Sequence, residues 1–332
     1  MPAVERMFVW AAGVRVAGTV IWCDPPQLRP RDVSFVSSAA LRPGRSAHAK
    51  GPPDDGRVIA SAETLAALAI DDGLPAQLGR PFALGRLRLE LLPAGSMPGA
   101  AQLLVEGPGL RALYAGAVSP LGGRVARPAQ VRACYALALR APLLARTLDP
   151  LPPRPDVETQ LVAAVAAALD AGHRVALGAA GLPTALETIA VLGPELRRRE
   201  VVINVSARWS PSAQLLALDV GELDPLTKRG GRPSPVSLGP LERLPKPTPR
   251  LTRIAVGDAG IAGVDLSSPL SAHADLPTLL DFIRSTGAVE VDLVEPLSPL
   301  VAEALATAAP NLTVRLLGPP SQVTFFAPDP SL

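Results

Sequence analysis

The sequence has few of the side chains that bind transition metals. Its 332 residues include three histidines, His48, His173 and His273, and two cysteines, Cys23 and Cys134, none at ligand spacing from another. A catalytic zinc ion usually has three protein ligands from histidine, cysteine or carboxylate, and a two-metal site needs more. A histidine-built two-metal centre is therefore out of reach.

Lysine and aromatic residues are also scarce. Only three of the 32 basic residues are lysine, and aromatic residues make up 3% of the chain. We interpret the excess of arginine as coding bias rather than as a phosphate-binding signal, although arginine is the better phosphate ligand. The net charge of +2 does not indicate a polyanionic partner, and few aromatic side chains are available to stack on bases.

No apolar run approaches the roughly 20 residues needed to cross a bilayer. Near the N-terminus, Glu5 and Arg6 precede a short apolar run over 7–14 without an A-x-A cleavage pattern, which predicts a strand rather than a signal peptide. The two cysteines suit a reducing compartment. We therefore expect a cytoplasmic protein with no membrane contact.

Apolar periodicity predicts a globular α/β chain, since 48% of the residues are hydrophobic and 19% are charged. Strands are expected at 14–22, 32–36, 58–60 and 87–91, with a hairpin of 103–106 and 110–115 and a helix over 62–69 capped by Ser61. Asp156 is expected to cap a helix that ends at Ala171. Strands at 173–178 and 201–205 alternate with a helix at 183–192, which predicts a parallel sheet.

The stretch 225–249 is rich in proline, glycine and basic residues, including Lys228, Arg229 and Arg232. We interpret it as a solvated linker, with a phosphate-contacting loop as the alternative. After it, 253–256 is expected to re-enter the first sheet. A helix from Pro277 to Ser285, ended by Gly287, and strands at 289–294, 312–316 and 323–326 then complete the chain, with a helix over 299–309 between them.

Three turns carry a resemblance to a known family. The stretch 269–275 reads Pro-Leu-Ser-Ala-His-Ala-Asp and presents His273 and Asp275; 93–102 is a glycine-shaped turn with Ser96; and 114–117 reads Tyr-Ala-Gly-Ala, ending at Ala117. The first resembles the Ser-Ala-His-Ala-Asp loop of metallo-β-lactamase-fold nucleases that carry a β-CASP domain. The others resemble that family's Ala-Gly-His-x-Leu-Gly-Ser-Ala-Gln and Tyr-Thr-Gly-Asp turns, with the ligand residues replaced.

The remaining ligand positions of that family are also replaced. Ser38, Ala40, Arg42 and Pro43 stand where the His-x-His-x-Asp-His loop would lie. Arg132 takes the place of the acidic residue in the Glu-Ala-Thr-Tyr-Gly strand, which resembles 131–136, and Glu295 takes the place of a histidine. The resemblance covers nearly the whole chain and is closer to the bacterial ligase-associated DNA exonucleases than to the RNA 3′-end processing factors.

The resemblance implies an αββα metallo-β-lactamase sandwich with an inserted β-CASP-like parallel α/β domain. The expected boundaries are 1–140 for the first part of the sandwich, 141–252 for the inserted domain and 253–332 for the return segment. Members of the family use two zinc ions. Because the ligands are replaced here, no metal or other cofactor is expected.

The resulting hypothesis is a catalytically inactive homologue that acts as a binding or assembly subunit. The resemblance implies an active β-CASP paralogue, a DNA ligase or a helicase as partner. One alternative is a residual Mg²⁺- or Mn²⁺-dependent nuclease using Asp24, Asp275 and Glu295. Another is a nucleic-acid-binding module that uses the cleft between the domains.

A further hypothesis concerns the cleft in which the metals of the family would lie. Buried carboxylates that lose a metal need another cation, so we expect the guanidinium of Arg42 or Arg132 to fill the cleft and pair with Glu295 or Asp275. His273 is expected to hold its loop through a ring-to-backbone bond. Asp275 is expected to cap the helix that follows it.

Overall fold

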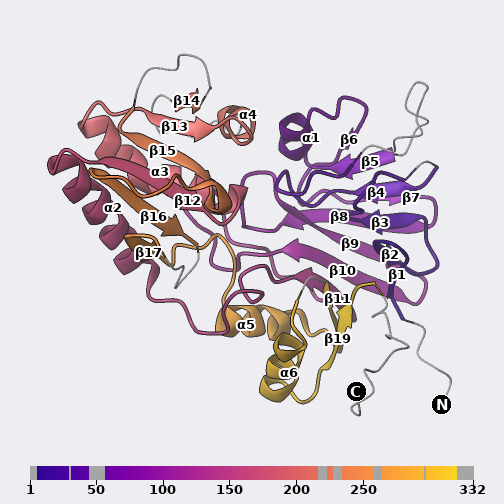
Figure 1. The fold of residues 1–332 in the computed structure, drawn as a ribbon. Coiled ribbons are helices and arrows are strands. Elements are labelled where there is room, and N and C mark those ends of the chain that lie inside the picture. Colours follow the sequence, from indigo (N-terminus) through magenta and orange to yellow (C-terminus); the bar gives the residue numbers. More distant parts are fainter. Residues whose placement is uncertain are drawn as a thin grey trace, which may run out of the picture.

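The computed structural model describes residues 6–29, 31–44, 57–215, 223–226, 234–257, 263–294 and 297–319. Across these residues it is a mixed α/β protein with three multi-stranded sheets and six α-helices (Figure 1). Within the same ranges, no helix combines the length and the apolarity needed to span a bilayer.

The first sheet is built from the N-terminal strands. Its order is β1 (Phe8–Trp10), β2 (Val14–Val16), β3 (Ile21–Cys23), β4 (Val33–Phe35), β5 (Arg57–Ala60) and β6 (Leu74–Pro75). The single strand predicted over 14–22 is wrong, because the chain turns at Gly18 (φ 69°) and pairs β2 with β3. The cap at Ser61 is confirmed: its side chain accepts from the Thr64 N–H at the start of α1 (Ala62–Leu68).

The second sheet combines strands from the segment 82–140 with two strands from the C-terminal part of the chain. Its order is β19 (Thr313–Leu317), β18 (Glu290–Val294), β11 (Ala136–Arg140), β10 (Leu110–Ala117), β9 (Ala101–Gly107), β8 (Leu87–Pro93) and β7 (Phe82–Leu84). The predicted hairpin is confirmed as β9 and β10. Of the segment 131–136, only Ala136 is in a strand, and Tyr135 is 40% exposed.

These two sheets pack face to face, and helices cover their outer faces. Phe8, Phe35 and Tyr114 belong to one apolar cluster that joins the sheets. The opposite face of the second sheet packs on α5 (Leu276–Thr286) and α6 (Pro299–Ala308), while α1 packs on the outer face of the first. Leu103 and Leu104 in β9 belong to different clusters, which explains why this strand is apolar at successive positions.

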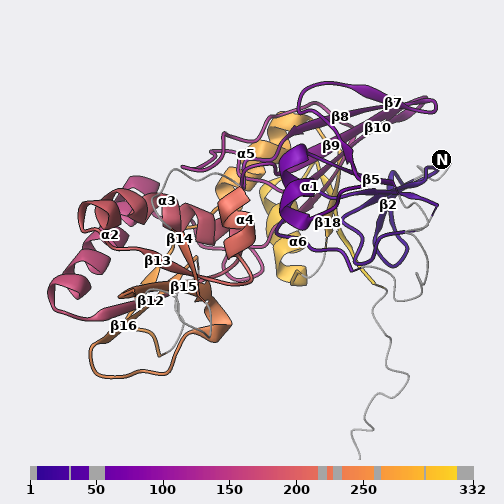
Figure 2. The same cartoon turned by 90° about the horizontal axis from the view of Figure 1, so that it is seen from above.

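The third sheet is formed by a continuous stretch of chain. Its order is β14 (Leu223–Leu226), β13 (Ile203–Ser206), β15 (Val236–Pro240), β12 (Arg174–Ala179), β16 (Leu251–Val256) and β17 (Leu266–Ser268), and all these pairings are parallel, as predicted. With α2 (Arg154–Asp170), α3 (Leu182–Arg198) and α4 (Ser210–Leu215) it forms a lobe beside the first two sheets (Figure 2).

Three sequence predictions in this lobe are wrong. The segment 253–256 does not re-enter the first sheet: β16 pairs with β12, and β17 adds at the edge. The chain thus stays in the third sheet to Ser268, past the position 252/253 where the boundary is predicted. The presumed linker 225–249 contains β15, a central strand. Helix α2 begins after Pro153, and Asp156 lies in its first turn without capping it.

The two parts of the molecule make both apolar and charged contacts. Ala67 of α1 lies in one apolar cluster with Trp209 and Ala213, next to and within α4. Glu187 of α3 is buried and accepts from the backbone N–H groups of Arg124 (2.9 Å) and Val125 (3.2 Å). The lobe of the third sheet is therefore in direct contact with the part formed by the first two sheets.

Candidate functional site

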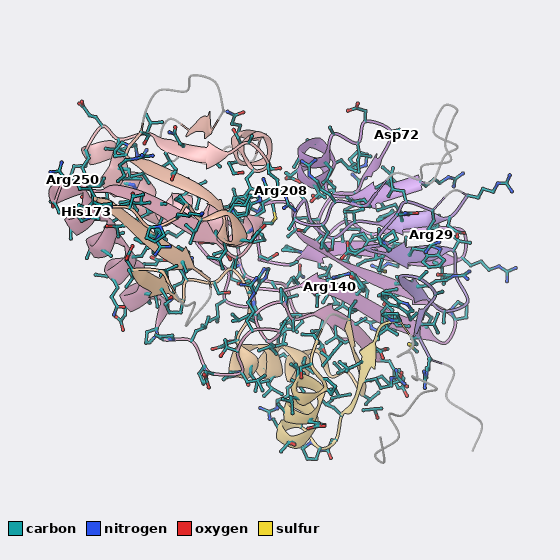
Figure 3. The ribbon with its side chains drawn as sticks, in the orientation of Figure 1. Arg29, Asp72, Arg140, His173, Arg208 and Arg250 are labelled. Atoms are coloured by element: carbon teal, nitrogen blue, oxygen red, sulfur yellow. The ribbon has the colours of Figure 1, made fainter. Side chains whose placement is uncertain are left out.

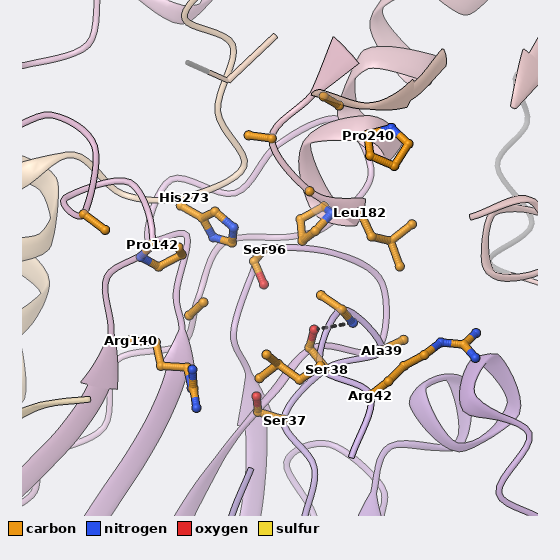
Figure 4. A pocket seen from close by; sticks show the side chains of 18 of the residues that line it. Ser37, Ser38, Ala39, Arg42, Ser96, Arg140, Pro142, Leu182, Pro240 and His273 are labelled. Carbon is orange, nitrogen blue, oxygen red and sulfur yellow. Dashed lines mark hydrogen bonds between the residues drawn. The ribbon is translucent and has the colours of Figure 1, made fainter. Parts of the chain in front are cut away.

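A pocket of about 600 Å³ lies between the second and third sheets (Figure 4). It brings together residues that are distant in the sequence. Six of the positions matched to metal ligands line it: Ser38, Ala40, Arg42, Ser96, Ala117 and His273.

The direction of the strands explains this convergence. Ser38 follows β4, Ser96 follows β8, and Ala117 ends β10. Strands β8 and β10 are each antiparallel to β9 and so run in the same direction, and β10, β11 and β18 are parallel neighbours. Residues at the carboxyl ends of such strands meet at one edge of the sheet, which is the usual position of a binding site in α/β proteins.

Other predicted site residues lie elsewhere. Pro43 lines a neighbouring pocket of about 170 Å³, and Asp275 lines a third of about 260 Å³. Arg132 is outside all three and forms an ion pair with Glu90 (2.7 Å). Predictions for His48, Lys228, Arg229, Arg232, Glu295 and the strand 323–326 fall outside the residues that the structure describes.

Behind the pocket wall, Asp24 is the acceptor of a dense hydrogen-bond cluster. Its carboxylate accepts from the Ser37 N–H (2.7 Å), the Ser37 hydroxyl (2.6 Å) and the Tyr114 hydroxyl (2.8 Å). Gly116 makes the approach possible, since a Cβ there would lie 2.8 Å from Ser37 Oγ. Burial, followed by the Asp24 charge, raises the pKa of Tyr114 well above its usual value, so the phenol stays neutral and donates.

A guanidinium does occupy this region, but it comes from Arg140. Its Nε donates to the Tyr114 hydroxyl (3.3 Å) and lies 4.0 Å from Asp24 Oδ2. The expected partners Arg42 and Arg132 do not take this role: Arg42 is exposed, and Arg132 is paired with Glu90. Sequence reasoning missed Arg140, although a single charge at the end of the apolar run 136–140 was a usable signal.

His273 borders both this pocket and the one that contains Asp275. Its backbone N–H donates to Ser271 Oγ (3.0 Å), whereas its Nδ1 is buried and has no hydrogen-bond partner among the described residues. Thus Nδ1 does not make the predicted ring-to-backbone bond. Burial, followed by the positive charge of Arg146, lowers the pKa of this histidine to about 4. The ring is therefore neutral at pH 7.

Asp275 caps α5, as predicted. Its side chain accepts from the Thr278 N–H (3.1 Å), and Oδ2 also accepts from the Leu151 N–H (3.0 Å). Asp275 therefore ties the segment leading to α2 to the start of α5. Within the described part of the chain its carboxylate accepts from these two backbone N–H groups and is not paired with Arg42 or Arg132, so the predicted ion pair is wrong for this residue.

The donor set of the pocket does not fit two zinc ions. Its described lining supplies one imidazole, His273, and one carboxylate, Glu242, among hydroxyl, alanine and guanidinium side chains. In the described part of the chain, no three histidine, cysteine, aspartate or glutamate side chains group as metal ligands would. A magnesium site on Asp24 and Asp275 does not fit either, because Asp24 faces Ser37 and Tyr114 while Asp275 lines a different pocket.

Comparison with known proteins gives a likeness in fold alone. No family model and no curated protein matches the sequence. The chain is similar to the crystal structure of a protein of unknown function from Enterococcus faecalis V583, with a TM-score of 0.54 and 14% identity over 86% of this chain and 79% of that one. At that identity the match concerns the arrangement of the elements and says nothing of chemistry.

Proposed function

We propose that this chain is a relative of the metallo-β-lactamase/β-CASP nucleases that has lost the metal site and serves as a binding or assembly subunit. One observation carries the proposal: six positions that the resemblance assigns to metal ligands converge on one pocket, yet five of them are serine, alanine or arginine. In this proposal the chain keeps the arrangement of a site at the strand ends but lacks the side chains that would bind the metals.

The layers of the fold support the same proposal. Two sheets that pack face to face between outer helices correspond to the αββα sandwich that the resemblance implies, and the parallel sheet of 174–268 corresponds to the inserted domain. Both assignments remain part of the proposal. The inserted domain is then taken to run from α2 to Ser268, and 269–319 returns to the sandwich.

Arg140 supports the proposal, because it supplies a cation beside the pocket where the family would have a metal. A buried carboxylate needs compensation, and Asp24 receives it from three hydrogen bonds and a guanidinium at 4.0 Å. A binding role needs the pocket and not a metal, and its volume of about 600 Å³ lies within the range of small-molecule sites. An active paralogue, ligase or helicase as partner, and a cytoplasmic location, rest on the sequence interpretation.

The decisive experiment measures metal content together with nuclease activity. The purified protein is analysed for Zn, Mn and Mg, and single-stranded DNA and RNA are offered with each metal added. We expect less than about one-tenth of an equivalent of metal and no cleavage. One equivalent or more of metal, with cleavage abolished by His273→Ala, would overturn the proposal and favour the residual nuclease.

A further inference from the structure

Two exposed arginines lie on opposite walls of the pocket. Arg42 follows β4 in the sandwich, and Arg208 lies in the turn between β13 and α4 of the parallel lobe (Figures 3 and 4). Neither has a hydrogen bond or ion pair to another described residue. Both guanidinium groups are therefore available to a ligand that enters between the two parts.

The pocket also receives the amino end of a long helix. Gly181 is the N-cap of the 17-residue α3 and provides no side-chain cap, and Ala180, Gly181 and Leu182 all line the pocket. Pro183 in the first turn has no N–H, but the other free N–H groups and the dipole at such a helix end favour a negatively charged group. This partial positive charge is a second feature, independent of the arginines.

Hydroxyl groups supplement these donors. Ser96 and Ser212 line the same pocket, whereas the hydroxyls of Ser37 and Ser38 already donate to Asp24 and Met97. Glu242 is the one carboxylate in the described lining. A phosphate monoester presents three terminal oxygens and close to two negative charges at neutral pH, whereas a carboxylate has two oxygens and one charge. The number of donors therefore suits a phosphate better than a carboxylate.

The size and boundaries of the pocket limit the rest of the ligand. Its volume of about 600 Å³ is larger than a phosphate alone requires, and Leu182, Trp209 and Pro240 add apolar lining. Residues of the segment 141–146 line the pocket, and Trp209 and Ser212 line it beside the contact between α4 and α1. A pocket of this volume, lined from both parts of the molecule, suits a small molecule rather than a nucleic-acid strand.

We propose that this pocket binds a small phosphomonoester with an aromatic or apolar body. Its phosphate lies between Arg42, Arg208 and the amino end of α3, and its body packs on Leu182, Trp209 and Pro240. The inference deepens the proposed function, because it requires that the pocket be a binding site rather than a metal centre.

Calorimetry with the full chain in EDTA tests this proposal, using phenyl phosphate as the probe. Inorganic phosphate lacks the aromatic body and so measures what the body contributes to affinity, and benzoate replaces the phosphate by a carboxylate and so measures what the phosphate contributes. A single-stranded oligonucleotide without terminal phosphates tests whether the pocket binds a nucleic-acid strand instead. We expect phenyl phosphate to bind best. Its affinity should fall as the pH drops from 8 to 5, because the phosphate monoester loses its second charge near its pKa of about 6.

Variants of the pocket then test where the ligand binds. Arg208→Ala and Arg42→Ala remove exposed side chains and should each raise the Kd for phenyl phosphate about tenfold without changing the Tm. The matched control is Arg86→Ala, which removes one exposed arginine from the turn between β7 and β8, at the other end of β8 from Ser96, and should leave the Kd unchanged.

Three results would overturn the proposal: no binding of phenyl phosphate, binding that Arg86→Ala weakens as much as Arg208→Ala, or tighter binding of the unphosphorylated oligonucleotide. The last would identify a nucleic-acid site instead. Calorimetry in EDTA measures ligand binding alone, whereas the nuclease assay measures metal content and cleavage, so failure of this inference can be told apart from failure of the proposed function.

Discussion

Asp24 and His273 are two polar residues beside the same pocket with opposite surroundings. The Asp24 carboxylate accepts three hydrogen bonds, from Ser37 and Tyr114, whereas His273 Nδ1 is buried without a described partner. A satisfied buried group stabilises the fold, while an unsatisfied one carries an energetic cost. Asp24 thus belongs to the framework of the pocket, and His273 is the less stable part of its wall.

The largest expected effect comes from removing the satisfied group. Asp24→Ala leaves the Ser37 N–H, the Tyr114 hydroxyl and the Arg140 charge without their acceptor, and should lower the free energy of unfolding by about 3 kcal/mol or more. Urea unfolding provides the measurement. The control is Asp32→Ala, which removes a partly exposed carboxylate that accepts from Trp22 Nε1 (2.8 Å) and should cost about 1 kcal/mol. Equal losses would contradict the comparison.

The second prediction concerns the pH dependence that His273 contributes. Its pKa is about 4 in the folded state and about 6.5 unfolded, so the unfolded state binds more protons between these values. Stability should be complete above pH 6.5 and fall as the pH drops toward 4. From pH 7.5 to 4.5, the wild type should lose about 2 to 3 kcal/mol more than His273→Gln. Parallel unfolding curves at each pH measure this difference, and identical pH profiles would show that the imidazole is not desolvated.

A smaller effect is expected from the donor side of the Asp24 cluster. Tyr114→Phe keeps the ring between Phe8 and Phe35 and removes only the hydroxyl that donates to Asp24, so it should cost about 1 to 2 kcal/mol. A double-mutant cycle with Asp24→Ala measures the coupling of the two residues. Strict additivity would mean that the hydroxyl and the carboxylate do not act together.

The smallest effects compare two aspartates for which the sequence predicted the same role. Asp275→Ala removes the cap of α5 and should cost about 1 kcal/mol, whereas Asp156→Ala removes an acidic side chain from the first turn of α2 and should cost a few tenths (about 0.3 kcal/mol). Thermal unfolding resolves the two. A larger loss for Asp156→Ala would contradict the assignment of the caps.

Local features were predictable from the sequence, and long-range partners were not. The caps at Ser61 and Asp275 and the hairpin of β9 and β10 depend on residues close in the chain. The placement of β16 was missed because a short apolar strand fits the first sheet or the third equally well until its neighbours are known. The same limit hid the role of Arg140, whose partner Asp24 comes from a different sheet.

Within the candidate site, the sequence predicted which positions share an edge but not which charge compensates Asp24. Strand ends follow from periodicity, and parallel neighbours bring those ends together. The choice among Arg42, Arg132 and Arg140 depends on side-chain reach across packed sheets, which periodicity does not encode. Arg132 forms an ion pair with Glu90, and this pair lies outside the pocket.

The connectivity of the sheets has a consequence for synthesis on the ribosome. All strands of the third sheet have been made once Ser268 is synthesised, whereas β11 in the second sheet waits for β18 and β19. Until those strands emerge, β11 presents an unpaired edge with apolar faces. Such an edge is a template for pairing with other chains. The nascent protein is therefore most exposed to aggregation after its inserted lobe is complete and before its C-terminal strands arrive.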